Sequence, residues 1–435
     1  MRRGRLRTLA RASLALGVLY LAAGYISARL DWVPSQPTVI AVELESLPIS
    51  PYQVAVAVAV HTERSHDALG DASEVVSAAR AAQLDAVLTT DHRSSDAPSD
   101  LWSEQAVFKE AVLLVPGQEV SLGSDVGRVL VFGLDTAIVA WDGGLESFAL
   151  KLQRDRATAI VAHSRSPRKR DSWRPTDTQG IVGWEVFDFA DIARARLSDP
   201  WLVYHLLALA SSAPLGRAHH SLARLHRDGF DQPAVAAFDS VYSRGRITAV
   251  GGLDVHPKWR IGGGLVPGYT PFFRAMANHF ILSAPLPSDA ESAREAVVET
   301  LAAGRVYISF FGPEGARGFT FAAASADAAA RAAGAARAAG VAGAFVSIGG
   351  EVAFSPGLVL VAGFAEREPG RLLYRIVRDG ATLQWVRGDR LSVPLLGPGV
   401  YRLEVYRYSL RVGPLLWNRR PWIFTNPIRV TAEIP

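Results

Sequence analysis

Histidines and acids follow several apolar runs of this 435-residue sequence, each at the point where a buried strand would end. These residues are His61 (after 54–60), Asp91 and His92 (after 86–90), Glu119 (after 112–117), His163 (ending 158–163), and Asp254 and His256 (ending 247–256). The carboxyl ends of the strands form the active face of barrels and open parallel sheets, so we expect these side chains to meet at one site.

The residue types at these strand ends indicate metal chemistry. The chain contains no cysteine, so thiolate ligands, disulfides and zinc fingers are excluded. Imidazoles and carboxylates together suit Zn, Mn or Fe, and we expect one or two divalent ions, with Glu119 able to bridge a pair. Such an ion lowers the pKa of bound water from 15.7 to roughly 7 and polarises a scissile group. The pattern therefore favours hydrolysis.

The elements that would position these side chains alternate along the chain. Between residues 50 and 310, short apolar runs alternate with helix-like patterns, such as the helix predicted over 71–84. The predicted strands are 54–60, 86–90, 112–117, 128–134, 158–163, 181–187, 247–256, 279–283 and 305–309. This alternation is typical of an α/β barrel or a wound α/β sheet.

Six short motifs in this region resemble one family, the PHP (polymerase and histidinol phosphatase) metallohydrolases. The motifs are HTERSHD (61–67), TTDH (89–92), PGQEVS (116–121), VAHS (161–164), WEVF (184–187) and GGLDVH (251–256). The resemblance implies a distorted (β/α)7 barrel over 51–318, with a site of one to three metal ions that usually hydrolyses phosphoesters.

The resemblance also implies roles for individual residues. It places in ligand positions His61, His92, Glu119, His163, Asp254 and His256, with either His66 or Asp67 in a further one. We expect His163 and Asp254 to act in catalysis as well. We expect Asp91 and Glu185 to orient ligands rather than bind the ion. The family usually has a His-x-His pair at the first motif, and Ala59 stands where its first histidine would be.

The C-terminal region supports a narrower resemblance. Residues 345–435 contain short alternating strands with turn signals, which predict a small antiparallel β-sandwich. A PHP-like domain followed by GVYRLEVY and PWIFTNPI is similar to the CehA/McbA branch, which includes carbamate hydrolases. The Ala-rich segment 319–344 is predicted to be a linker, and a helical insertion over about 190–230 is long enough to cap the barrel mouth.

The N-terminal 30 residues predict a membrane-targeting segment. The 17 residues between Arg11 and Arg29 carry no charge, and five arginines precede them. This length lies between a signal-peptide core and a full span, so a signal-anchor and a cleaved signal peptide both remain open. The arginine flank favours a cytoplasmic N-terminus and a body outside the cytoplasm, reached through the linker 31–50.

The distribution of charge along the chain indicates which class of partner the protein binds. Of the 46 basic and 42 acidic residues, six arginines and no acid lie in residues 1–29, which leaves 40 basic residues against 42 acidic ones. The nearly neutral body argues against a nucleic-acid partner. Arg165, Arg168 and Lys169 follow His163 closely and are expected to bind an anionic small-molecule substrate.

Two hypotheses for the function follow. The first is a metal-dependent hydrolase outside the cytoplasm, acting on phosphoesters ahead of carbamates or amides. The second is a catalytically weakened PHP-like module that binds or scaffolds in the cell envelope. Ala59 favours the second hypothesis, whereas the retention of Asp254, His256 and the other motif positions favours the first.

Overall fold

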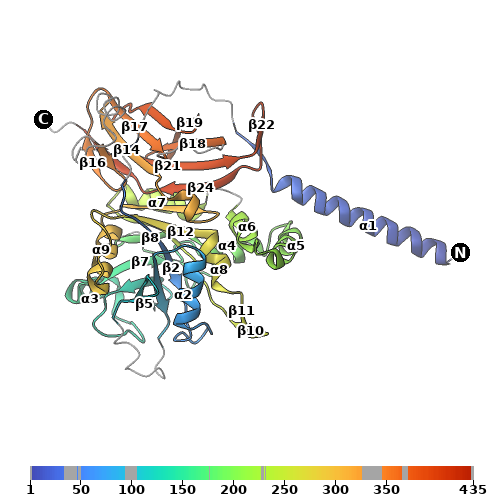
Figure 1. Cartoon of the computed structure of the whole chain (residues 1–435), viewed down its shortest axis with the longest axis horizontal. Coiled ribbons are helices and arrows are strands. Elements are labelled where there is room, and N and C mark those ends of the chain that lie inside the picture. The colour runs from blue at the N-terminus through green and yellow to red at the C-terminus, as the bar shows by residue number, and fades with distance from the viewer. Residues whose placement is uncertain are drawn as a thin grey trace.

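The structure is a computed structural model, and it describes residues 2–33, 47, 50–93, 105–175, 177–226, 230, 232–325, 345–364 and 371–432, with the backbone alone for 2–10. Most of the predicted linker 31–50 and residues 326–344 of the predicted Ala-rich linker lie outside these residues. Helix α1 (Arg2–Ser27) projects from one side of the body, and the C-terminal strands lie together at one end of it (Figure 1).

Among the described residues, sixteen strands form one mixed sheet. Ten precede residue 311: β2 (Gln53–Val60), β3 (Ala86–Asp91), β4 (Val107–Lys109), β5 (Val112–Ser121), β6 (Arg128–Phe132), β7 (Thr158–Ala162), β8 (Gly183–Asp188), β9 (Thr248–Gly252), β12 (Met276–Ile281) and β13 (Val306–Phe310). Six follow: β16 (Glu351–Ala353), β18 (Arg371–Arg378), β19 (Ala381–Arg387), β21 (Gly399–Tyr408), β24 (Arg420–Thr425) and β25 (Ile428–Thr431).

Three smaller sheets complete the described strands. A four-stranded sheet contains β15 (Phe345–Ser347), β14 (Thr320–Ser325), β17 (Leu358–Gly363) and β20 (Leu391–Pro394). A three-stranded sheet contains β1 (Leu30–Trp32), β23 (Leu415–Trp417) and β22 (Leu410–Val412), and a hairpin contains β10 (Trp259–Ile261) and β11 (Gly264–Val266). Strand β14 lies within the segment predicted as a linker, and its residues pair with β15 and β17.

Strand direction explains how the large sheet gathers the polar strand ends. Strands β2, β3 and β5 pair in parallel, and so do β7, β8 and β9. Strand β6 is antiparallel to both β5 and β7, so these two run in the same direction. The segment after β9 then returns to β2, where the N–H of Leu253 donates to the carbonyl of Val58 at 2.9 Å. Six strands therefore present their carboxyl ends to one region.

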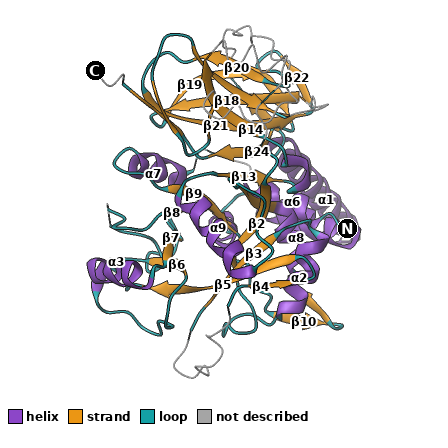
Figure 2. Ribbon diagram, turned by 60° about the vertical axis from the view of Figure 1, so that its left-hand side comes forward, coloured by secondary structure: helices purple, strands orange, loops and turns teal. Residues whose placement is uncertain are grey.

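The helices cover the sheet or pack beside it (Figure 2). Helix α2 confirms the helix predicted over 71–84. It begins with a capping box in which the side chain of Asp71 accepts a hydrogen bond from the N–H of Glu74. The described helices after α1 are α2 (Ala72–Ala81), α3 (Gly144–Asp155), α4 (Phe189–Arg196), α5 (Leu202–Ser212), α6 (Ala218–Ala223), α7 (Pro233–Tyr242), α8 (Tyr269–Ala275) and α9 (Ala290–Ala302).

The predicted distorted (β/α)7 barrel is wrong, because the sheet is mixed. Strands β6, β12 and β13 pair antiparallel with their neighbours. A parallel pair needs a long crossover, whereas the short connection from β5 to β6 allows direct antiparallel return. Alternation of apolar runs and helical patterns in the sequence does not distinguish these two kinds of connection.

The predicted separate β-sandwich is also wrong. Strand β24 pairs antiparallel with β13, with Ile308 opposite Phe424, so the C-terminal strands continue the large sheet. Figure 2 shows β24 next to β13 at this junction. Side chains reinforce it, because the buried guanidinium of Arg402 on β21 pairs with Asp239 on α7 through two contacts of 2.8 Å. The residues of β13 are all buried, and its backbone pairs with β24 on the side away from β12.

The predicted N-terminal membrane segment is not supported by the structure. Within the part of the chain that is described, no helix is long and apolar enough to cross a bilayer.

Candidate metal centre

His61 stands at the end of the most deeply buried strand near the site. Every residue of β2 except Gln53 is buried, as expected for a strand covered on both faces. The strand bulges between Val58 and Val60, where Ala59 has a φ of 60°. His61 follows with no exposed surface, and its Nε2 has no hydrogen-bond partner among the described residues. A buried ring nitrogen without a hydrogen bond fits a metal ligand.

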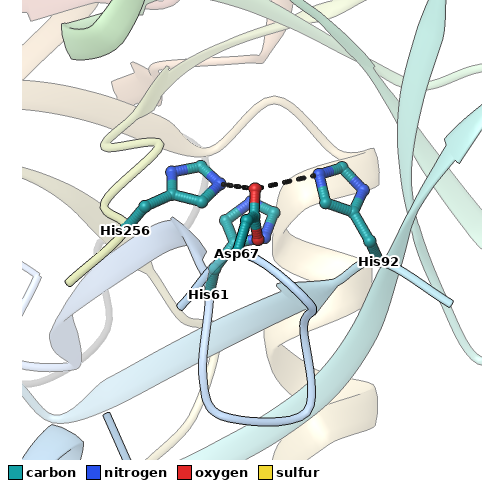
Figure 3. Close-up of side chains that lie close together, drawn as sticks. All are labelled: His61, Asp67, His92 and His256. Atoms are coloured by element: carbon teal, nitrogen blue, oxygen red, sulfur yellow. Dashed lines mark ion pairs between the residues drawn. The ribbon is translucent and has the colours of Figure 1, made fainter. Parts of the chain in front are cut away.

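Four side chains from three separate strand ends form a cluster around this nitrogen (Figure 3). The members of this His61 cluster are His61, Asp67, His92 and His256, which offer ligand atoms within 4.8 Å of one another. Oδ2 of Asp67 lies 3.1 Å from Nε2 of His256 and 3.7 Å from Nε2 of His92. The rings of His61 and His256 stack with their centroids 3.9 Å apart. Three imidazoles and one carboxylate make a donor set that suits Zn, Mn or Fe.

The charges within the cluster are tightly linked. Burial alone would raise the pKa of Asp67, but the ion pair with His256 and the hydroxyl of Ser65 hold it far below its usual range. Burial alone would lower the pKa of His256, but Asp67 and Asp254 raise it to about 9. Without a metal, His256 is therefore protonated at neutral pH. A metal ion that binds there must displace this proton.

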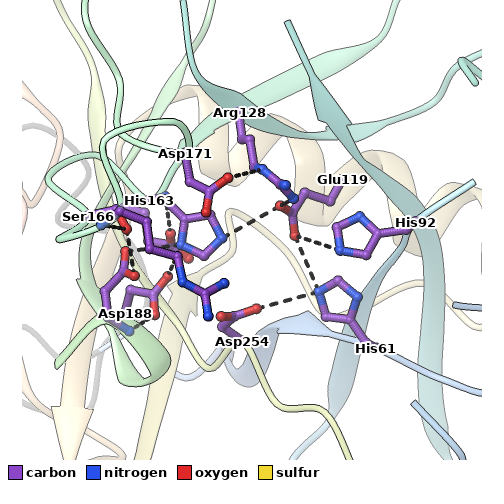
Figure 4. Close-up of polar contacts among 12 residues, drawn as sticks. His61, His92, Glu119, Arg128, His163, Ser166, Asp171, Asp188 and Asp254 are labelled. Carbon is purple, nitrogen blue, oxygen red and sulfur yellow. Dashed lines mark hydrogen bonds and ion pairs between the residues drawn. The ribbon is translucent and has the colours of Figure 1, made fainter. Parts of the chain in front are cut away.

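Glu119 on β5 lies between the His61 cluster and His163 (Figure 4). Its Oε2 is 3.4 Å from Nε2 of His61, and its Oε1 is 3.5 Å from Nε2 of His163. Burial alone would raise the pKa of Glu119, but contacts with His163 and His61 keep it well below its usual range. The ionised carboxylate thus faces both halves of the site, the His61 cluster on one side and His163 with its acids on the other.

His163 is surrounded by acids on its other side. Its Nδ1 lies 2.7 Å from Oδ2 of Asp188 and 3.0 Å from Oδ2 of Asp191, and its backbone N–H donates to Glu185 at 2.7 Å. Burial opposes protonation of His163, but Asp188 and Asp191 raise its pKa well above the usual value. The ring is therefore held as an imidazolium, with Nε2 facing Glu119. The φ of 51° at His163 sets this orientation at the end of β7.

Asp254 completes the inner face of the site. It follows β9 with a φ of 44°, and its Oδ1 is 3.7 Å from Nε2 of His61. Its Oδ2 is buried and has no hydrogen bond among the described residues, although a guanidinium nitrogen of Arg194 lies 3.7 Å away. His61, Glu119 and Asp254 form a second group whose ligand atoms lie within 4.8 Å of one another.

The two halves share one cavity of about 310 Å³. Its basic wall residues are Arg93, Arg128, Arg168, Arg170, Arg194 and Lys258. Arg128 donates to Glu119 at 2.7 Å and contacts Asp171 at 2.9 Å. A cavity that combines buried acids and imidazoles with a basic wall can hold a cation and an anionic ligand together.

The other predicted site residues take different places. His66 is exposed on the cavity wall and lies outside the His61 cluster, whereas Asp67 belongs to it. Asp91 accepts from both the N–H and the hydroxyl of Thr62, at 2.6 and 2.9 Å, and so fixes the chain next to His61. Of the three predicted substrate residues, Arg168 lines the cavity, while Arg165 and Lys169 are exposed and do not line it.

Several charged residues of the site were not predicted from the sequence, among them Arg128, Asp188, Asp191 and Arg194. Asp188 directly ends the strand predicted over 181–187, so the strand-end argument that found Glu119 could have found it. Asp191 follows three residues later, where its N–H bonds to Asp188 at the start of α4. The two arginines carry no sequence signal, because charged residues at a strand start or on a helix are usually solvated.

The donor set is compatible with a divalent metal ion. The buried histidine and carboxylate groups lie within metal-binding distance, and His61 Nε2 and Asp254 Oδ2 are buried polar atoms without a hydrogen bond in the described part of the chain. Comparison of the sequence with protein-family models gives no match, and a search of the curated proteins gives none either.

Proposed function

We propose that this chain is a metal-dependent hydrolase of the PHP type, with phosphoesters as the first substrate class and carbamates and amides as the second. One observation supports this proposal above the others. Side chains from three strand ends converge as the His61 cluster, inside a cavity whose wall is rich in arginine.

A divalent ion held by His61, Asp67, His92 and His256 would lower the pKa of bound water to roughly 7 and polarise the scissile group. The side chains supply the remaining functions. Arg168 and Lys258 line the cavity as exposed cations and can bind the anionic oxygens of a substrate. Oδ2 of Asp254 makes no hydrogen bond among the described residues and is placed to orient a water molecule in the site.

His163 is placed to act as the acid. The carboxylates of Asp188 and Asp191 hold Nδ1 and raise the pKa of the ring, so Nε2 carries a proton that faces the cavity. Protonation of a leaving-group oxygen needs a proton donor in that position. Asp188 and Asp191 act through His163 and orient it.

The test is turnover by the full chain reconstituted with Zn, Mn or Fe(II). Aryl phosphate monoesters, aryl phosphodiesters and aryl carbamates serve as chromogenic substrates. We expect hydrolysis that requires the metal, is abolished by a chelator, and is lost in His92→Ala. His219→Ala on α6, outside the cavity wall, is the matched control and keeps the activity. Equal activity with and without metal would contradict the proposal.

A second candidate function is a binding module without turnover. Ala59, which cannot coordinate a metal, stands at the end of β2 two residues before His61, and this observation favours a weakened site. A chain that binds metal with His61 and His92 but hydrolyses none of the three substrate classes would support this second function.

A further inference from the structure

We propose that the centre takes one divalent ion, at the His61 cluster, and that Arg194 supplies the positive charge on the His163 side that a second ion would otherwise supply. This inference rests on the proposed function and deepens it, because it names the metal stoichiometry and the residue that sets it.

The first argument concerns the ligands that are shared. The His61 cluster and the group of His61, Glu119 and Asp254 have His61 in common. Only Nε2 of His61 approaches the carboxylates of Glu119 and Asp254, at 3.4 and 3.7 Å. Its Nδ1 lies 3.4 Å from the hydroxyl of Ser65 instead. One ring nitrogen binds one ion, so these two groups describe a single metal position.

The second argument concerns the remaining group, His163, Glu185 and Asp188. Its atoms already serve one another. Glu185 accepts from the backbone N–H of His163 at 2.7 Å, and Nδ1 of His163 lies between Asp188 and Asp191. A second ion there would have to replace contacts that the chain makes with its own groups.

The third argument concerns Arg194, which reaches between the two halves from α4. One guanidinium nitrogen donates to Asp191 at 2.6 Å, and the other lies 3.7 Å from Oδ2 of Asp254. Asp191 in turn contacts His163, and Asp254 faces His61. Arg194 is therefore a permanent cation beside the acids that surround His163, next to the group where a second metal would bind.

Arg128 places a second guanidinium beside the Glu119 oxygen that faces His163. It contacts Glu119 at 2.7 Å and Asp171 at 2.9 Å. Two guanidinium groups thus lie among the acids around Glu119 and His163. The carboxylate of the His61 cluster, Asp67, contacts His92 and His256 and forms no ion pair with an arginine among the described residues. Divalent charge is therefore repelled on the His163 side and accepted at the His61 cluster.

The experiment measures metal equivalents per full-length chain after equilibrium dialysis against excess Zn or Mn, by elemental mass spectrometry. We expect one equivalent in the wild type and two in Arg194→Met, which removes the cation but keeps similar bulk. Arg194→Lys keeps the charge and should hold one equivalent. Arg294→Met is the matched control, because Arg294 pairs with Glu291 at 2.6 Å on α9 at the same three-residue spacing, outside this cavity.

The outcomes distinguish failure of this inference from failure of the proposed function. Two equivalents in the wild type would overturn the inference and leave the hydrolase proposal standing. One equivalent in a folded Arg194→Met would also overturn it. No metal in the wild type would overturn both. Circular dichroism verifies that each variant is folded. Arg194→Gln replaces Arg194→Met if the Met variant does not fold. The metal stoichiometry of the wild type tests the inference without any variant.

Discussion

Nε2 of His256 lies 3.1 Å from Oδ2 of Asp67, so residues that follow two different strands, β9 and β2, meet as an ion pair in the centre of the site. This pair holds the His61 cluster together in the metal-free chain. The same two atoms are ligand atoms, so a proton and a metal ion compete for His256.

We predict that metal affinity rises with pH through this competition. The pKa of His256 is raised to about 9, so the ring must lose a proton to bind metal at neutral pH. Affinity should fall about tenfold for each pH unit below 9 from this one proton. Calorimetric or chelator-competition titrations between pH 6.5 and 8 measure the slope. In His256→Gln the slope should decrease by about one proton; an unchanged slope would contradict the assignment.

Neighbouring residues in one loop provide the second prediction. Asp67→Asn removes the only carboxylate of the His61 cluster and should weaken metal binding more than about 100-fold, the upper end of the cost of losing a ligand's outer partner. His66→Gln changes an exposed ring beside it and should leave the affinity near that of the wild type. Both are measured by the same competition titration. The reverse order would show that His66 is the ligand.

The third prediction concerns a carboxamide that ties the C-terminal region to the site. Asn426 accepts from the N–H of Ala249 at 2.6 Å and donates to the carbonyls of Ala249 and Val306, both at 2.9 Å. Asn426→Ala leaves these buried groups unsatisfied and should lower the free energy of unfolding by about 3 kcal/mol, since each such group costs about 1–3 kcal/mol.

Denaturant unfolding measures this loss. Gln384→Ala removes a half-buried carboxamide from β19, which pairs with β18, and is the control. Equal destabilisation by the two variants would show that Asn426 has no special role. Because Ala249 belongs to β9, which leads to Asp254, Asn426→Ala should also weaken metal binding.

The fourth prediction concerns the continuity of the large sheet. A chain that ends at residue 325 loses β24, and with it the partner of Tyr307, Ile308 and Ser309 on β13. It also leaves Asp239 without Arg402. We expect this truncated chain to unfold without a cooperative transition, or at a much lower temperature, in thermal circular dichroism. A truncated chain that melts like the full chain would show that the C-terminal strands are an independent unit.

The sequence was sufficient to predict the convergence at the site. Side chains at the ends of buried strands meet when those strands run in the same direction. The strand that carries Glu119 and the strands that precede His61, His92, His163 and Asp254 do so. The choice between His66 and Asp67 was not predictable, because it depends on how the loop after His61 turns. In the structure, the hydroxyl of Ser65 bonds to Asp67 at 2.7 Å and helps to position it.

The architecture could not be predicted to the same extent. Apolar runs such as 128–132 and 306–310 have the same composition whether they pair parallel or antiparallel. The sequences of β6 and β13 therefore did not predict a mixed sheet. The union of β13 with β24 depends on residues more than a hundred positions apart. Arg194 and Arg128 were missed for a related reason, because only the fold brings their guanidinium groups beside Asp254 and Glu119.

Metal content of the purified full chain, measured by elemental mass spectrometry beside a His92→Ala/Asp254→Ala double variant, tests the central claim most directly. The account predicts at least one equivalent of Zn, Mn or Fe in the wild type and a loss of that metal in the folded double variant. A correctly folded wild type that stays empty after incubation with each metal would contradict it.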